Sequence, residues 1–111
     1  MNAREFNKLL DKIGNNILIN TQDIVQEAVF TGERTAKKAC PVDTGMLRAS
    51  ITSNIGVLEG TVGTNVEYAP FVEYGTSTQS AKPFMKPAEK KAQNLINKKM
   101  RRVIEESVKW Y

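Results

Sequence analysis

Few side chains in this sequence could do chemistry, and the most suggestive of them is a carboxylate in a glycine turn. Asp43, Thr44 and Gly45 follow one another shortly after Pro41. If two chains brought such turns together, the two carboxylates could share a proton and activate a water molecule for peptide hydrolysis. The chain has no histidine, and Cys40 is its single cysteine. These absences exclude Ser-His-Asp hydrolysis and zinc sites built from His and Cys, and we expect no metal and no cofactor.

Asp-Thr-Gly is also the active-site tripeptide of the aspartic proteases, so a dimeric protease is one hypothesis for this chain. Those enzymes are nearly all β and place the aspartate after an apolar strand. Here Asp43 follows a helical pattern that ends in Lys37-Lys38-Ala39-Cys40. We therefore interpret Asp43 as a capping residue that accepts from backbone N–H groups, and Gly45 as a left-handed residue. No residue is assigned a catalytic role.

The composition indicates a single intracellular domain. The 111 residues are enough for one core, and 16 Lys and Arg against 12 Asp and Glu give a net charge of +4. This excess permits contact with acidic surfaces without requiring nucleic acid. No apolar run approaches the ~20 residues that cross a bilayer. The unpaired cysteine suits a reducing cytosol, and the first residues begin an amphipathic helix, so we expect a protein that is made and kept inside the cell.

The first 40 residues are predicted to form a long helical arm. Pro41 ends the pattern, because a proline disfavours helix at the residue before it. Gly14-Asn15-Asn16 and Thr31-Gly32 are weak points, so the arm is either continuous or split into two helices. About 35 residues would extend ~50 Å, more than the core of such a domain needs. We therefore predict that part of the apolar stripe contacts another molecule. The stripe follows helical spacing: Phe6, Leu9, Leu10, Ile13, Ile17, Ile24, Ala28, Thr35 and Ala39.

The middle of the chain, residues 41–83, is predicted to hold a small antiparallel sheet. Residues 51–57 alternate in polarity and are predicted to form the first strand, and residues 61–66 are predicted to form the antiparallel second strand. Leu58-Glu59-Gly60 is predicted to form the turn between them, with Gly60 at positive φ. Residues 68–74 fit either a short strand or a helical turn. Residues 75–82 have no apolar side chain larger than alanine and are predicted to be a mobile surface loop.

Residues 84–111 are predicted to form a second long helix with Pro87 near its start. The sequence thus predicts one α+β domain over residues 1–111, with a long N-terminal helix, an antiparallel hairpin-based sheet and a C-terminal helix. The last helix has an apolar stripe and an opposite basic face. The basic residues are Lys86, Lys90, Lys91, Lys98, Lys99, Arg101, Arg102 and Lys109.

Three short blocks interrupt the helices and carry all four prolines. They read Pro-Val-Asp-Thr-Gly-Met-Leu-Arg from Pro41, Tyr-Ala-Pro-Phe-Val-Glu-Tyr-Gly-Thr from Tyr68, and Ala-Lys-Pro-Phe-Met-Lys-Pro-Ala from Ala81. In this order, with a helix before and after, they resemble the head-tail joining or tail-completion family of long-tailed bacteriophages and prophages. The resemblance covers about half of the chain.

This resemblance implies a structural virion protein rather than an enzyme, located in the virion at the head-tail junction or tail after a stage in the host cytoplasm. It implies a ring homo-oligomer whose partners are the portal-side connector and the tail tube or tail terminator proteins. The predicted interface residues are Ile13, Ile17, Ile24, Thr76, Ser77, Thr78, Gln79 and Ser80. The residues expected to define the structural motif are Pro41, Asp43, Thr44, Gly45, Leu47, Arg48, Tyr68, Ala69, Phe71, Glu73, Tyr74, Gly75, Thr76, Pro83, Phe84 and Pro87.

Three features have a second interpretation. Arg48 and Glu73 are predicted to form an ion pair between the first two blocks, with separate solvation as the alternative. The aromatic series Tyr68, Phe71 and Tyr74 is expected to be a packed edge, although exposed rings would anchor a neighbouring subunit. The basic face of the last helix is expected to be solvated or to face protein. The alternative is a small cytosolic nucleic-acid-binding protein that uses this helix.

Overall fold

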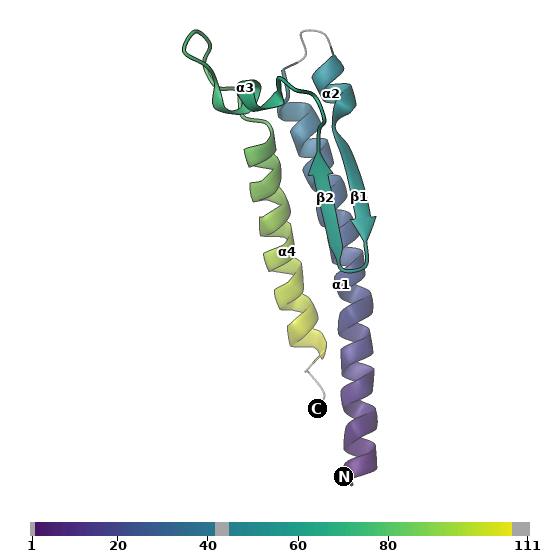
Figure 1. The fold of residues 1–111 in the computed structure, drawn as a ribbon. Coiled ribbons are helices and arrows are strands. Elements are labelled where there is room, and N and C mark those ends of the chain that lie inside the picture. Colours follow the sequence, from purple (N-terminus) through teal and green to yellow (C-terminus); the bar gives the residue numbers. More distant parts are fainter. Residues whose placement is uncertain (1, 42–44, 108–111) are drawn as a thin grey trace.

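The computed structural model, which describes residues 2–41 and 45–107, has two long helices joined by a hairpin and two short helices (Figure 1). The α+β class is confirmed, with a long N-terminal helix, a two-stranded antiparallel sheet and a C-terminal helix. In chain order the elements are α1 (Ala3–Ala39), α2 (Met46–Ser50), β1 (Thr52–Gly56), β2 (Glu59–Gly63), α3 (Ala69–Tyr74) and α4 (Met85–Ser107).

Helix α1 is one continuous helix of 37 residues. At its start the Asn2 side chain accepts from the Glu5 N–H at 2.9 Å, and the Glu5 carboxylate accepts from the Asn2 N–H at 3.3 Å, which forms a capping box. At its end Cys40 has extended backbone and Pro41 follows. Gly14 does not interrupt the helix, because a single glycine costs only ~1 kcal/mol against the cooperativity of so many turns.

Helices α1 and α4 run antiparallel, and the hairpin lies along α1 beside α4 (Figure 1). Small residues set the contact between the helices: a Cβ added at Gly32 would lie 3.7 Å from the Ala92 Cβ and 3.8 Å from the Ala88 carbonyl oxygen. The core continues to the end of the molecule that holds α2 and α3. Its buried members are Ala36, Cys40, Leu47, Ile51, Ala69, Phe84 and Ala88.

The molecule is far longer than it is wide. Its extents are 69 × 20 × 19 Å and its radius of gyration is 19.3 Å, against ~13 Å for a compact chain of this length. The N-terminal part of α1 accounts for the difference, because it continues past the hairpin and its first turns continue past the last turn of α4 (Figure 1).

The hairpin corrects two details of the sequence prediction. The two turn residues are Val57 and Leu58, and the positive φ of 57° belongs to Leu58. Gly60 lies within β2 opposite Ile55, so its predicted positive φ was wrong. Its role is close approach: a Cβ built at Gly60 would lie 2.2 Å from the Val29 Cγ2 on α1. A side chain there would push the hairpin off the helix.

Two short helices complete the middle region. Helix α2 lies between Gly45 and the first strand, where no helix was predicted from the sequence. Residues 69–74 form α3, which decides between the strand and the helical turn in favour of the helix.

Candidate interaction surfaces

The described residues of the first motif block, Pro41 and 45–48, follow the end of α1 and begin α2. Residues 42–44, which include the predicted capping residue Asp43 and the motif residue Thr44, lie outside the described residues. Gly45 has φ 75°, as predicted, and begins α2. Leu47 then enters the core, and the Arg48 Nε is buried without a hydrogen-bond partner in the described residues. Burial raises the pKa of the Cys40 thiol, an effect that the nearby Arg48 charge partly opposes. This thiol is therefore a core group and not a nucleophile.

The predicted Arg48–Glu73 ion pair is wrong, because the Glu73 carboxylate is used elsewhere. Its Oε1 accepts from the backbone N–H of Phe84 at 3.0 Å and of Met85 at 2.8 Å, and its Oε2 accepts from Lys86 at 3.3 Å. These are N–H groups at the start of α4 that have no partner within the helix. Glu73 therefore caps α4 from α3 and joins the second motif block to the third.

The third block fixes the beginning of α4 in the core. Phe84 is 1% exposed and belongs to the same cluster as Ala69, the buried residue of α3. Pro83 and Pro87 are exposed, and Pro87 stands in the first turn of α4, where a missing N–H costs nothing. The block is thus a helix-starting element rather than a binding motif.

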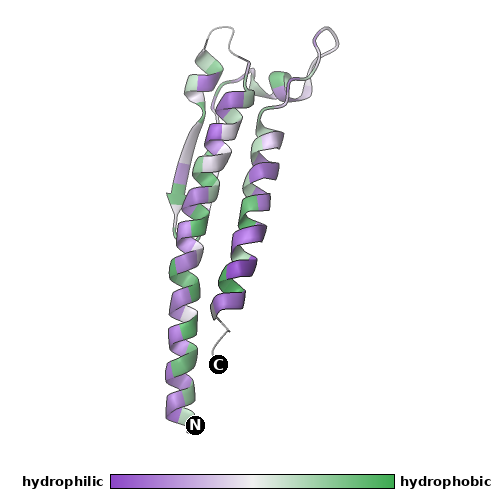
Figure 2. Ribbon diagram, turned by 180° about the vertical axis from the view of Figure 1, so that it is seen from behind, coloured by the Kyte–Doolittle hydropathy of each residue, from purple (hydrophilic) through white to green (hydrophobic). Residues whose placement is uncertain are grey.

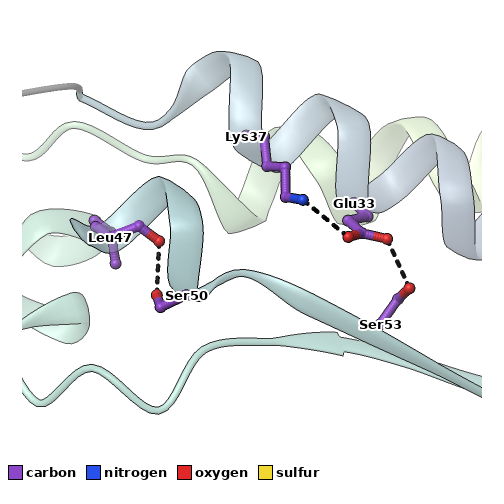
Figure 3. A network of polar contacts seen from close by, with 5 residues as sticks. All are labelled: Glu33, Lys37, Leu47, Ser50 and Ser53. Carbon is purple, nitrogen blue, oxygen red and sulfur yellow. Dashed lines mark hydrogen bonds and ion pairs between the residues drawn. The ribbon is translucent and has the colours of Figure 1, made fainter. Parts of the chain in front are cut away.

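A polar network holds the hairpin to α1 (Figure 3). The Glu33 carboxylate accepts from the Ser53 hydroxyl at 2.6 Å and pairs with the Lys37 ammonium at 3.1 Å. The Ser53 hydrogen bond, and secondly the Lys37 hydrogen bond, lower the pKa of Glu33 below its usual value. At the end of α2, the Ser50 hydroxyl donates to the Leu47 carbonyl at 2.6 Å, a hydrogen bond within that helix. The Ser53–Glu33 hydrogen bond is the contact of this network that links β1 to α1.

The aromatic series on α3 faces solvent rather than forming the packed edge that was expected. Tyr68, Phe71 and Tyr74 are 39%, 58% and 81% exposed, so exposure rises toward the loop that follows. Residues 76–80, which include all five predicted loop contacts, are exposed as well. The base of the loop is closed by the Lys82 N–H, which donates to the Val72 carbonyl at 2.8 Å. Rings and loop together form a surface suited to protein contact.

At the opposite end, the first turns of α1 form an apolar arm, defined here as residues 3–17. Figure 2 shows hydrophobic residues recurring along α1 past the end of α4. Phe6 and Leu10 are 46% and 50% exposed. Of the predicted interface residues, Ile13 and Ile17 are half-buried, whereas Ile24 is 5% exposed within the subunit. Ile24 is therefore a core residue and is not available to a partner, because the hairpin and α4 flank α1 at its level.

An apolar groove of about 480 Å³ lies between the hairpin, α1 and α4. Its lining includes small residues, Ala28, Gly32, Ala88 and Ala92. The larger lining residues are Val25, Val29, Leu58, Val62, Met85 and Ile96, together with Glu59, Gly60, Glu89 and Gln93. Sequence reasoning missed this groove because it depends on how β2 and α4 stand relative to each other.

The outer face of α4 is basic. In Met85–Ser107 there are seven basic and three acidic residues, a net +4 that equals the excess of the whole chain. Lys99 alone of these bases forms an ion pair within the described residues, with Glu27. The bases of α4 without an ion pair in the part of the chain that the structure describes are Lys86, Lys90, Lys91, Lys98, Arg101 and Arg102.

Among residues 2–41 and 45–107 there is no group of three acidic, His or Cys residues that could hold a metal ion. Within the same ranges, every helix is too short or too polar to span a lipid bilayer.

The chain matches a known protein family. A family model described as "Bacteriophage HK97-gp10, putative tail-component" matches residues 4–75, which is more than half of the chain. It covers all but the first residue of α1, then α2, the hairpin, α3, the first motif block and the second block up to Gly75. Neither a search of curated proteins nor a search of solved structures gave a significant match.

Proposed function

Because the chain belongs to the HK97-gp10-like family of bacteriophage tail components, we propose that it joins head to tail, or completes the tail, by assembling as a ring. As a tail component it has a structural role in the virion and contacts other virion proteins. We propose, more specifically, that it lies at the junction between the portal-side connector and the tail tube or tail terminator proteins.

The observation that carries this proposal is the arm of α1. A straight apolar helix segment that its own subunit leaves half open is costly in water and favours burial by a neighbour. Repeated around an axis, such contacts give a closed ring. We expect the isolated chain to associate weakly and the ring to form on a template, where several contacts act together.

The α3 end supplies a second contact in this proposal. Tyr68, Phe71 and Tyr74, with the loop residues Thr76–Ser80, lie at the end of the molecule opposite the arm (Figure 1). In a ring with the long axis of the subunit near the ring axis, the two ends would meet different layers of the junction. The aromatic rings would then anchor the adjacent connector or tail protein.

Gene disruption in the phage tests the proposed role. Without this protein, filled heads and finished tails should accumulate separately in electron micrographs, and supplying the chain in trans should restore joined particles. A Leu10→Glu chain should restore them poorly, whereas Asn94→Glu, on the outer face of α4, should act like wild type. Joined, infectious particles that lack the protein would refute the proposal.

The basic face of α4 favours a second candidate role, contact with DNA that passes through the junction. Six bases on α4 form no ion pair among the described residues and could neutralise phosphates, and such binding weakens steeply as salt rises. Duplex DNA retention should therefore fall with ionic strength and fall further in a Lys90→Glu/Lys98→Glu variant. Retention that is absent at low salt would leave α4 as a solvated or protein-facing surface.

A further inference from the structure

The arm and the groove are two apolar surfaces on one rigid subunit that cannot cover each other. The arm continues α1 in a straight line away from the groove, which lies between the hairpin and α4 (Figure 1). We propose that the arm of one subunit docks into the groove of a second copy of the chain. This inference rests on the proposed ring and identifies the contact that would build it.

The position of α4 defines how much of α1 is left open. The helices are antiparallel, with Gly32 beside Ala88 and Ala92 and with the Thr21 hydroxyl 3.6 Å from the Met100 sulfur. At 1.5 Å per residue in both helices, Ser107 lies about level with residue 15 of α1. The arm residues before that point have no described residue of α4 opposite them. Phe6 and Leu10 therefore remain about half exposed.

The groove suits a helix of this kind. Grooves that bind helices receive anchors at i, i+3 or i+4, and i+7. The arm offers Phe6, Leu10, Ile13 and Ile17 at such spacing. An apolar cavity of ~150 Å³ holds one benzene, so about 480 Å³ accommodates on the order of three large side chains.

The area involved favours a weak contact between copies rather than a stable dimer. Phe6 and Leu10 are about half exposed and offer roughly 100 Å² each, and the less exposed Ile13 and Ile17 add less, so the arm buries on the order of 300 Å², with a similar area in the groove. The total, about 600 Å², is below the ~1,200 Å² at which stable interfaces begin. Because the arm and the groove are unlike surfaces, the contact is head to tail and gives each subunit two neighbours, which is the condition for closing a ring.

Cysteine cross-linking tests this pairing. Leu10→Cys places a thiol on the arm and Ala92→Cys places one in the groove, while the native Cys40 is buried. With a short bismaleimide, mixing the two single variants should give a heterodimer and stop there, whereas one chain carrying both changes should give a ladder of higher oligomers. Asn94→Cys, on the outer face of α4, is the control and should give at least about tenfold less heterodimer with Leu10→Cys.

Two results would overturn the inference. Leu10→Cys alone giving as much dimer as the mixture would mean that two arms pair symmetrically. Equal yields with Ala92→Cys and Asn94→Cys would mean that the groove is not the acceptor. Neither result touches the proposed function, which depends on the presence of the wild-type chain in joined particles and on its loss in the gene disruption.

Discussion

Replacing Gly60 with alanine tests whether β2 lies directly on α1. The added Cβ would be 2.2 Å from the Val29 Cγ2, a distance that real Cβ contacts do not show. Val29 is buried and β-branched, and its χ1 is nearly fixed in a helix, so the methyl group cannot rotate away. The hairpin must move instead, and it is tied to the helix by the Gln22 side chain, which donates to the Gly56 carbonyl at 3.0 Å.

The cost follows from overpacking. Inserting a methyl group into a packed contact costs ~1–3 kcal/mol, partly offset by the ~0.5 kcal/mol that alanine gains over glycine in a strand. We expect Gly60→Ala to lower stability by about 1–2 kcal/mol, or about 4–16 °C in Tm for a domain of this size. Urea unfolding followed by circular dichroism measures it.

Gly63→Ala is the matched control, because it lies in the same strand and nothing is within 4 Å of its built Cβ. It should be neutral or slightly stabilising. Adding Val29→Ala to Gly60→Ala should recover most of the loss, since it removes the opposing methyl groups, and a double-mutant cycle should give a coupling of about 1 kcal/mol or more. If Gly60→Ala and Gly63→Ala unfold at the same urea concentration, the close approach has been misread.

Three further predictions concern single contacts. Gly45→Val should cost more than ~1 kcal/mol in thermal unfolding, because a β-branched residue is strained at φ 75°, and an unchanged Tm would argue against that conformation. Glu73→Ala should cost ~0.5–2 kcal/mol by leaving the first N–H groups of α4 uncapped, and amide exchange at the start of α4 should quicken, so unchanged exchange would count against the cap. Glu33 has a lowered pKa in the folded chain, so its contribution to stability is present at neutral pH and is lost as pH falls below ~4.5 toward the folded value. Ser53→Ala removes the largest cause of that shift and should flatten this acid loss, and acid titrations of equal slope for variant and wild type would contradict it.

The helices could be predicted from the sequence because their signals are local. Spacing of apolar residues, a proline after the last turn and a proline in the first turn each act within a few residues of the element they define. The continuity of α1 could not be decided in this way. It depends on whether packing of Ala28, Gly32 and Ala36 against the rest of the chain outweighs the helix-weakening residues near Gly14.

The wrong predictions concern residues whose role depends on a partner far away in the sequence. Gly60 looks like a turn glycine in sequence, yet its role is set by Val29, 31 positions earlier. Glu73 looks like a partner for Arg48, yet the backbone N–H groups of Phe84 and Met85 take its oxygens. A backbone N–H group can donate whatever side chain its residue carries. A search of the sequence for oppositely charged residues could therefore not reveal this cap. The groove is likewise a property of two elements together.

The apolar stripe of α1 shows how the structure sharpens the predicted interface. Ile13, Ile17 and Ile24 share one face in the sequence, but the structure buries Ile24 and leaves the earlier residues partly open. Ile17→Glu is therefore a poor test, because it perturbs the last turns of α4 and the arm at once.

Variants at Leu10 and Ile24 distinguish the surface that contacts a partner from the core of the subunit. Ile24→Glu buries a charge beside the core and should unfold the chain, as judged by circular dichroism. Leu10→Glu should leave a folded monomer of unchanged Tm that no longer self-associates in sedimentation at high concentration. A Leu10→Glu chain that unfolds would place the arm in the subunit's own core and would remove the surface on which the proposed ring depends.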